Sequence, residues 1–287
     1  DVRVDESLHL RGYAEEIECR IAVQICSHFV DETEKLRVPE HIARHLAHSR
    51  RVLFITGAGI SADSGLPTYR GVGGLYNDEA TEDGLPIETA LSGALFAVRP
   101  DITWKYLAQI AHNCRGAQPN PAHLAIASLE QKIPGTFVFT QNVDGLHRKA
   151  GSTNLIEIHG NLQTLICPQC NFQETVDDLT GRDLPPRCPK CGSVLRPNVV
   201  LFGEALPEVA MARFIDTLEE GIDMVFTIGT SAVFPYISEP IVWAAQAGIP
   251  TVEINPVHTR LTPHVEYHLP LGAADAMTAI MARLDRG

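Results

Sequence analysis

Short apolar runs, rich in β-branched and aromatic residues, recur along the chain and alternate with longer segments of mixed polarity. Runs that are apolar on both faces are typical of strands in a parallel sheet that helices cover on both sides. The segments between them predict crossover helices, for example at 122–129 and 209–218, and 41–50 predicts a helix before the first strand. The pattern therefore predicts an α/β fold with a mostly parallel sheet. The predicted strands are 52–56, 136–140, 155–158, 199–202, 224–228 and 250–254.

Polar residues and glycines directly follow every one of these predicted strands. In chain order they are Gly57-Ala-Gly59, Gln141-Asn142, His159-Gly160, Gly203-Glu204, Gly229-Thr-Ser231 and Asn255-Pro256. Open α/β sheets bind their ligands beyond the carboxyl ends of the strands. The sequence thus predicts one site that is assembled from several strand ends.

Two stretches interrupt the alternating pattern. Residues 72–116 hold a glycine-rich loop and two predicted helices, at 86–96 and 101–112, and residues 166–196 hold four clustered cysteines. Together they predict a smaller composite domain, made of a zinc ribbon and a helical insertion. The larger domain then consists of residues 41–71, 117–165 and 197–287.

The clustered cysteines form two C-x2-C pairs, separated by seventeen residues. This spacing is typical of a zinc ribbon, in which two tight turns each offer two thiolates to a tetrahedral ion. Two disulfides or a redox pair are the alternatives, but a redox C-x-x-C needs no duplicate. Because all four candidate ligands are cysteines, we expect a closed structural Zn²⁺ site. The ligands are Cys167, Cys170, Cys188 and Cys191.

Composition narrows the classes of function. Acidic residues outnumber basic ones by 35 to 23, and the resulting net charge of −12 disfavours sequence-independent binding to nucleic-acid phosphates. No apolar run approaches the roughly 20 residues of a membrane helix, so no membrane association is expected. Seven cysteines, an odd number, favour a reducing, cytoplasmic location. Residues 1–40 predict an N-terminal helical extension, with Ile17, Ile21, Ile25 and Phe29 at helical spacing.

The loop after the first predicted strand fits the G-x-G-x-x-(G/A) dinucleotide fingerprint, from Gly57 to Ala62. Such a loop brings backbone N–H groups close to a pyrophosphate at the start of a helix. A dehydrogenase would place a second strand with a terminal acid about twenty residues later. Here that region is the glycine-rich stretch 73–79, and Asn255 is the better candidate for a ribose contact. An NAD-dependent oxidoreductase is therefore the weaker interpretation.

Longer motifs resemble those of the sirtuins, the NAD-dependent protein deacylases. The resemblance spans roughly residues 41–285, and the first motif is the longest, from Gly57 to Gly71. Later motifs follow in the order of the family. They are Gly57-Ala-Gly-Ile-Ser-Ala-Asp-Ser-Gly-Leu-Pro-Thr-Tyr-Arg-Gly71, Thr140-Gln-Asn-Val-Asp144, Leu146-His-Arg-Lys-Ala-Gly151, Glu157-Ile-His-Gly160, the zinc ribbon, Phe202-Gly-Glu204, Gly229-Thr-Ser231 and Asn255.

The resemblance implies binding of NAD and an acyl-lysine peptide between a Rossmann-like domain and a zinc-bearing small domain. The acyl group passes to the nicotinamide ribose, yielding nicotinamide, deacylated lysine and O-acyl-ADP-ribose. By motif position His159 is the general base, a role that suits an imidazole near neutral pH. Asn142 and Asp144 match the polar pair of the nicotinamide pocket. Arg70 matches the arginine near the reacting ribose, and Tyr69 stands where many relatives have a shielding phenylalanine.

The resemblance also implies residues that contact NAD and substrate. Val200 and Phe202 are equally well explained as ordinary core residues of a strand. The expected cofactor contacts are Gly57, Ala58, Gly59, Ser61, Tyr69, Arg70, Gln141, Asn142, Asp144, Gly229, Thr230, Ser231 and Asn255. The expected substrate contacts are Val200, Phe202, Gly203, Glu204 and Val233.

Departures from the family bear on the substrate class. Desuccinylating sirtuins carry a Tyr-x-x-Arg pair, and with Trp104 as an anchor the matching positions are Leu107 and Ile110. An apolar pocket does not compensate a buried carboxylate, so a neutral acyl group is expected. The 229–235 segment is one residue shorter than the common pattern, which weakens the assignment of Val233. An ADP-ribosyltransferase that uses the same NAD site and an NAD-sensing module without catalysis are two further interpretations.

Overall fold

The structure is a computed structural model that describes residues 38–68 and 80–286. The predicted N-terminal helix therefore lies outside the described residues, except for its last few positions. Tyr69, Arg70 and the glycine-rich stretch 73–79 lie outside them too. Within the described residues, no helix is both long and apolar enough to cross a membrane.

A six-stranded sheet forms the larger domain, and every pair of neighbouring strands in it is parallel. The strand order is β3-β2-β1-β7-β8-β9. Five of the six predicted apolar runs are strands of this sheet, as expected, and the short β9 is an addition. The strands are β1 (Arg51–Thr56), β2 (Gly135–Thr140), β3 (Leu155–Glu157), β7 (Met224–Ile228), β8 (Thr251–Ile254) and β9 (Tyr267–Leu269).

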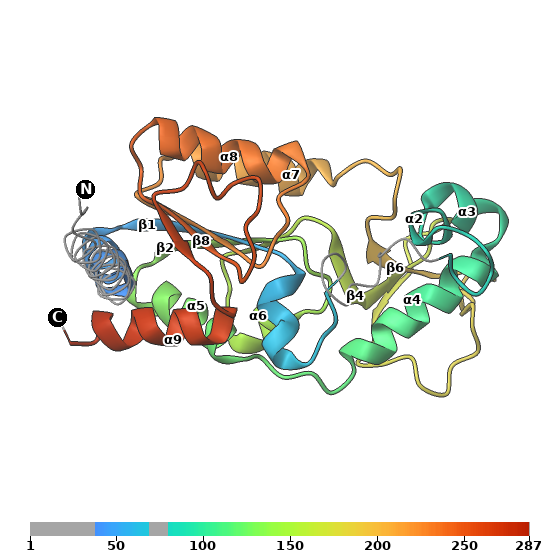
Figure 1. The fold of residues 1–287 in the computed structure, drawn as a ribbon. Coiled ribbons are helices and arrows are strands. Elements are labelled where there is room, and N and C mark those ends of the chain that lie inside the picture. Colours follow the sequence, from blue (N-terminus) through green and yellow to red (C-terminus); the bar gives the residue numbers. More distant parts are fainter. Residues whose placement is uncertain (1–37, 69–79, 287) are drawn as a thin grey trace, which may run out of the picture.

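Helices cover both faces of this sheet (Figure 1). Side chains of β1 alternate between the two layers: Val52 and Phe54 pack with the layer of α5 and α9, Leu53 and Ile55 with the layer of α7 and α8. Period-two alternation with both sets apolar is what a parallel strand covered on both faces requires. The predicted helices at 41–50, 122–129 and 209–218 are confirmed. The helical segments are residues 38–48, the 3₁₀ helix η1 (Ala58–Ser64), α5 (Pro121–Lys132), α6 (Leu146–Ala150), α7 (Glu208–Glu219), α8 (Pro235–Gln246) and α9 (Ala273–Leu284).

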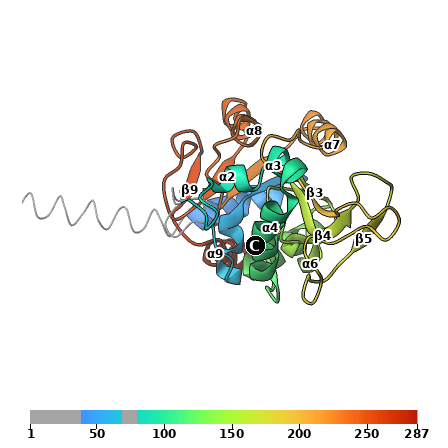
Figure 2. The same cartoon turned by 90° about the vertical axis from the view of Figure 1, so that its right-hand side faces the viewer.

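The smaller domain lies at one end of the parallel sheet and combines three helices with a three-stranded antiparallel sheet (Figures 1 and 2). The indole N–H of Trp104 in α4 donates to the carbonyl of Leu195 beside β6, at 2.7 Å. Both residues belong to one buried cluster, so the helical insertion and the cysteine-bearing segment share a core. Its elements are α2 (Ile87–Ala90), α3 (Gly93–Val98), α4 (Pro100–Cys114), β4 (Gly160–Ile166), β5 (Gln173–Thr175) and β6 (Arg196–Val199).

One predicted strand was wrong in place and in partner. The run at 199–202 does not join the parallel sheet: only Val199 is in a strand, the last residue of β6, which pairs antiparallel with β4 in the small sheet. Along β6 buried residues alternate with more exposed ones, so only one face is covered. Four consecutive apolar residues at 199–202 suggest a strand that is buried on both faces, which the small sheet does not provide. Beyond β6, only an isolated bridge links Phe202 to Ser92.

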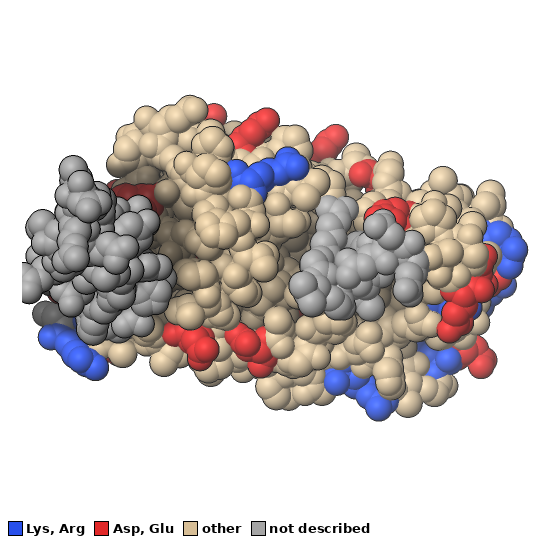
Figure 3. All heavy atoms as spheres, in the orientation of Figure 1, with Lys and Arg blue, Asp and Glu red and all other residues tan. Residues whose placement is uncertain are grey.

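Charge is dispersed over the surface seen in Figure 3. Acidic and basic side chains stand along the edges of this face and at its small-domain end. Neither sign forms a continuous patch on the part of the face that belongs to described residues. The acidic excess of the sequence therefore produces no concentrated field here.

A close backbone contact joins the loops after β1 and β7. The N–H of Gly59 donates to the Gly229 carbonyl at 2.8 Å, and the N–H of Gly57 donates to Ile228 at 3.0 Å. A Cβ added to Gly59 would stand 2.6 Å from the Gly229 Cα, and one added to Gly229 would stand 2.4 Å from the Gly59 carbonyl carbon. Gly229 also has a φ of +60°, a conformation that other residues rarely adopt. Only glycines allow these loops to meet.

Replacing Gly229 by alanine should therefore destabilise the protein far more than the same change at Gly248. Gly248 has a similar φ of +72°, but a Cβ there would meet no atom within 4 Å. Gly248→Ala should lower the free energy of unfolding by about 1 kcal/mol, because only the backbone conformation is penalised. Gly229→Ala adds a backbone collision and should cost several times as much. Urea unfolding followed by circular dichroism compares the two; equal losses would refute the steric constraint.

Candidate active site

Between β1 and β7 the order in which the chain adds strands to the sheet reverses, and the carboxyl ends of these two strands mark that switch point. From β1 the chain proceeds to β2 on one side, and β7 and β8 extend the sheet on the other. Doubly wound sheets bind nucleotides at such switch points. A pocket opens there between η1, α4 and the segment after β2. Its lining residues are Ala58, Ser61, Leu66, Pro67, Ile110, Asn113, Cys114, Asn142, Val143 and Asp144.

Three predicted cofactor residues form one hydrogen-bonded group in this pocket. The amide nitrogen of Asn142 donates to the Gly57 carbonyl at 3.0 Å and contacts the Ser61 hydroxyl at 3.2 Å. Ser61 donates to the Asp144 carboxylate at 2.8 Å, and the Leu146 N–H donates to the other carboxylate oxygen at 2.9 Å. Burial raises the pKa of Asp144, and these two donors oppose the rise. The group therefore fixes a half-buried acid against the glycine loop.

Thr230 connects the strand ends on the other side of the switch point. The side-chain amide of Gln141 donates to its hydroxyl at 2.9 Å, and the Asn255 amide donates to its carbonyl at 3.1 Å. The N–H of Ala232 also binds the Thr230 hydroxyl, at 3.1 Å. Thus Gln141, Thr230 and Asn255, from three different strand ends, meet as predicted. The side chain of Ser231 is exposed beside them.

His159 lies between β3 and β4, at the edge of the parallel sheet. Its Nδ1 lies 2.9 Å from the Gln141 carbonyl oxygen, and its Nε2 lies 2.8 Å from the hydroxyl of Tyr236. A carbonyl can only accept, so Nδ1 carries the proton and Nε2 holds the lone pair. Burial lowers the pKa of His159, and the Gln141 carbonyl raises it in part. The imidazole is therefore neutral near pH 7, with its basic nitrogen at Nε2.

A second histidine supports the site from behind. Thr56 and Thr140, the last residues of β1 and β2, are hydrogen bonded to each other at 2.8 Å. The Nε2 of His147 lies 2.9 Å from the Thr56 hydroxyl, so the ring holds both strand ends. Burial lowers the pKa of His147. The ring of His123 packs edge-on against it, and burial lowers the pKa of His123 to about 4. His147 lies inside one of the family motifs, but no pattern indicated this contact.

Backbone hydrogen bonds to neighbouring segments hold the expected substrate strand, from Val200 to Glu204. The N–H of Val200 donates to the His159 carbonyl at 2.9 Å. The N–H of Phe202 donates to Leu91 at 3.0 Å, and its carbonyl accepts from Gly93 at 3.1 Å. The backbone of Phe202 is thus bonded to the start of α3, whereas Val200 is bonded to the residue that carries the candidate base.

Glu204 forms an ion pair within the small domain. Its two carboxylate oxygens accept from Arg196 at 2.6 and 2.9 Å, and one of them also accepts from the Leu201 N–H at 2.9 Å. Burial opposes ionisation, but these donors hold the pKa of Glu204 below its ordinary value. The carboxylate therefore shapes the turn at Gly203, which has a φ of +81°. Direct contact of either residue with substrate stays a prediction.

The short loop after β7 adopts an unusual conformation. Ala232 has a φ of +50°, and it is the one described non-glycine residue with positive φ. Its side chain is buried, whereas that of the adjacent Val233 is 39% exposed. The left-handed residue turns the chain between β7 and α8. The peptide-contacting role of Val233 stays untested.

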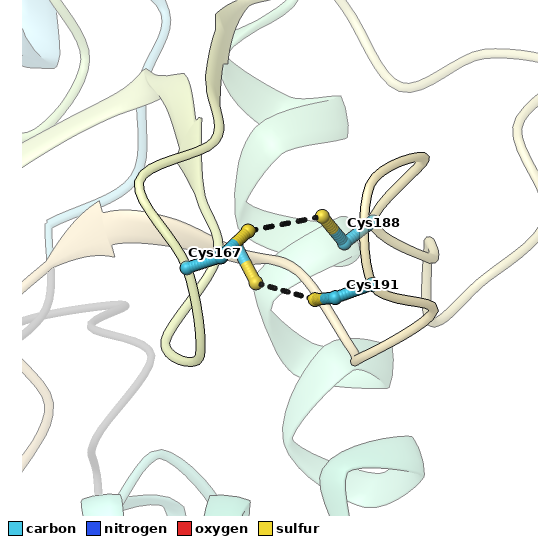
Figure 4. Close-up of side chains that lie close together, drawn as sticks. Cys167, Cys188 and Cys191 are labelled. Carbon is cyan, nitrogen blue, oxygen red and sulfur yellow. Dashed lines mark hydrogen bonds between the residues drawn. The ribbon is translucent and has the colours of Figure 1, made fainter.

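The four predicted zinc ligands converge in the small domain (Figure 4). The Sγ atoms of Cys167 and Cys191 are 3.5 Å apart, and those of Cys170 and Cys188 are 3.6 Å apart. Zinc–thiolate bonds of about 2.3 Å in a tetrahedron place sulfurs about 3.8 Å apart, and disulfide sulfurs are bonded at about 2.05 Å. The donor set and spacing fit a structural Zn²⁺ ion.

Comparison with known proteins identifies the family. The profile of the Sir2 family matches residues 57–235. An NAD-dependent protein deacylase 2 of Pseudomonas syringae pv. tomato is 50% identical over 245 residues, which cover 84% of this chain and 98% of that protein. The chain belongs to the Sir2 family. This confirms the resemblance to the sirtuins.

Solved Sir2 structures share the fold of this Sir2-family chain. A Sir2 homologue in complex with NAD superposes with a TM-score of 0.77 and 36% identity, covering 86% of this chain and 94% of the other. A Sir2 protein with a p53 peptide and NAD⁺ superposes with a TM-score of 0.74 and 28% identity, covering 86% and 98%. The Rossmann-like sheet with a smaller composite domain is thereby confirmed.

Replacing Cys188 by serine should abolish stoichiometric zinc binding, because a closed four-thiolate site loses one of its ligands. Elemental analysis of purified protein would measure about one zinc per chain before the change and much less after it. Cys114→Ser is the matched control, because Cys114 is outside the four-cysteine cluster. A full zinc complement in the Cys188 variant would contradict the assignment.

Proposed function

We infer that this Sir2-family chain removes acyl groups from protein lysines in an NAD-dependent reaction, with His159 as the general base. Family membership and the activity named for its relatives support the NAD-dependent deacylase. The observation that supports the base is the neutral imidazole at the carboxyl end of β3, whose Nε2 holds the lone pair.

The residues at the switch point suit a dinucleotide. The glycine loop leads into η1, and the start of a helix after a glycine turn suits the close approach of a pyrophosphate. Asn255 and Gln141 offer amide groups for ribose hydroxyls from either side of Thr230. Asn142 and Asp144 provide a polar wall in the pocket beside α4, as proposed for the nicotinamide end. Arg70 and Tyr69 are proposed contacts outside the described residues.

In the proposed mechanism the protein contributes positioning and one proton acceptor. NAD, when bound, supplies the ribose that receives the acyl group. His159 accepts a proton from a ribose hydroxyl at Nε2, while the Gln141 carbonyl stabilises the imidazolium through Nδ1–H. Asp144 is held by Ser61 and the Leu146 N–H, so its charge acts at a fixed place beneath the glycine loop. The proton that His159 holds at Nε2 can then be passed to the deacylated lysine as it leaves.

The peptide substrate is proposed to approach along the segment from Val200 to Glu204. Extended peptides gain affinity from main-chain hydrogen bonds, so recognition there would depend little on peptide sequence. Since the backbone of Phe202 is bonded to α3, pairing would use the groups on either side of it. The Arg196–Glu204 pair keeps this segment in place.

A neutral acyl group suits the apolar side chains at the two positions where an acidic acyl group would need a Tyr-x-x-Arg pair. Ile110 lines the pocket, and Leu107 is buried in the small-domain core. Among the described lining residues there is no lysine or arginine, and the one charged group is Asp144. A terminal carboxylate would lose its hydration and meet no cation here. Acetyl or a longer uncharged chain is therefore the proposed substrate.

His159→Ala should reduce turnover of an acetyl-lysine peptide by about 10²–10⁴-fold, because the proton acceptor is removed. NAD binding, measured by calorimetry, should remain within a few-fold. The reaction is followed by mass spectrometry of O-acetyl-ADP-ribose, with and without NAD. His264→Ala is the control, because that side chain is exposed and away from the strand ends. Unchanged turnover would remove His159 from its role, and turnover independent of NAD would overturn the proposed reaction.

Peptides that differ only in the acyl group test the substrate class. Acetyl-lysine should be hydrolysed at least about tenfold more efficiently than succinyl-lysine, since one uncompensated carboxylate costs more than about 1.4 kcal/mol. The comparison uses kcat/KM at saturating NAD. A succinyl preference would show that a cation enters the pocket from elsewhere.

A further inference from the structure

A tyrosine hydroxyl is hydrogen bonded to the nitrogen with which the proposed base would accept a proton. Tyr236 is the second residue of α8, and its oxygen lies 2.8 Å from the Nε2 of His159. The two rings meet edge-on, with centroids 6.2 Å apart. None of the family motifs contains this tyrosine, and nothing in the sequence pattern indicated the contact.

The hydrogen bond has a defined direction. Because Nδ1 of His159 donates to the Gln141 carbonyl, Nε2 can only accept in the neutral ring. Burial raises the pKa of Tyr236 to about 12, so its hydroxyl keeps its proton. The tyrosine O–H therefore donates to the lone pair of Nε2.

The loop after β7 and the start of α8 hold the tyrosine in this place. Ala232 turns the short loop through its left-handed conformation, and Pro235 begins the helix one residue before Tyr236. The ring of Phe234 stacks on that of Tyr236, with centroids 5.5 Å apart and planes inclined by 14°. The hydroxyl is thus placed by the backbone and by a ring neighbour, and not by chance orientation of a free side chain.

One lone pair cannot serve two donors. A ribose hydroxyl that gives its proton to Nε2 must first take the place of the tyrosine O–H, since Nδ1 is already committed to a carbonyl. We propose that Tyr236 is a positioning residue that caps the base in the ligand-free enzyme and yields Nε2 to the ribose hydroxyl when both substrates bind. The cap holds the ring in its reactive tautomer and lowers its affinity for a solvent proton. This proposal rests on the assignment of His159 as the base.

Other charged groups do not explain the state of this histidine. Among the described residues, Asp144 follows β2, Glu157 precedes His159 and is paired with Arg148, and Glu239 lies on α8. None of their charges contributes to the lowered pKa of His159, which burial causes and the Gln141 carbonyl opposes. Removal of the tyrosine hydroxyl is therefore a clean perturbation of the base.

Tyr236→Phe tests the cap, because it keeps the ring and its stacking and removes only the hydroxyl. Neutral imidazole loses a donor, so the pKa of His159 should rise. The acid limb of kcat/KM, which reports the free enzyme, should move to higher pH. The limb of kcat, which reports the substrate complex, should stay in place. On the alkaline plateau kcat/KM should increase about 2- to 10-fold, the equivalent of one hydrogen bond that no longer has to be exchanged.

Tyr267→Phe is the matched control. Its hydroxyl also contacts a histidine, His45 at 3.2 Å, but on β9 and away from the site. This variant should reproduce the wild-type pH profiles. A loss of turnover at all pH values in Tyr236→Phe, without displacement of either limb, would assign the tyrosine a merely structural role and overturn the proposal. Displacement of both limbs would overturn it as well, because the bond would then persist in the complex.

Titration of the histidine ring by NMR separates this proposal from the assignment of the base. In the ligand-free protein the His159 resonance should titrate at higher pH in Tyr236→Phe than in the wild type, whatever the role of His159 in turnover. If the NMR shift occurs and His159→Ala still turns over substrate, the base assignment fails and the cap loses its function. If the NMR shift is absent, the hydrogen bond itself is refuted.

Discussion

Contact between two glycine backbones determines how the rest of the site is arranged. Gly59 and Gly229 approach more closely than any side chain would permit, and this brings the loops after β1 and β7 together at the switch point. Thr230 follows directly and receives the amide groups of Gln141 and Asn255. Four strand ends thereby share one small volume. Without this approach the loops would separate, and the polar groups that they carry would face different directions.

The chemistry of His159 depends on what surrounds it more than on the imidazole itself. Burial makes the charged ring unfavourable, the Gln141 carbonyl fixes the proton on Nδ1, and a hydroxyl meets the opposite nitrogen. Behind these groups, His147 joins the ends of β1 and β2 through a pair of threonines. The result is a neutral base in one tautomer, held by hydrogen bonds from elements that are distant in sequence.

Much of this arrangement could be predicted from the sequence, because local patterns encoded it. The strands of the parallel sheet are apolar on both faces, and the residues that follow them are short and polar. The C-x2-C pairs specify their own geometry, so Cys167 and Cys191 were predictable as partners in one cluster. Family motifs placed Asn142 and Asp144 in one pocket, where the structure also brings them together.

Other features depend on long-range contacts that no local pattern records. The apolar run at 199–202 resembles a parallel strand, yet only Val199 is in a strand, and that strand pairs with β4 of the small sheet. No local pattern indicated the ion pair of Glu204 with Arg196, which is formed through two hydrogen bonds. The contact of Tyr236 with His159 joins the start of α8 to the residue after the end of β3, two segments that are far apart in the sequence. Such contacts are determined by tertiary packing, which the propensities of single residues do not record.

The hydrogen bond from Val200 to the His159 carbonyl has a consequence for selectivity. It ties the strand proposed to receive the peptide to the residue proposed to receive the proton. A peptide that seats poorly on this strand would leave the base misaligned by a fraction of an ångström, while most of its binding contacts survive. Discrimination among target proteins would then be expressed in the rate of the bound complex and not in its affinity. Such an enzyme would bind many acylated proteins and process few of them quickly.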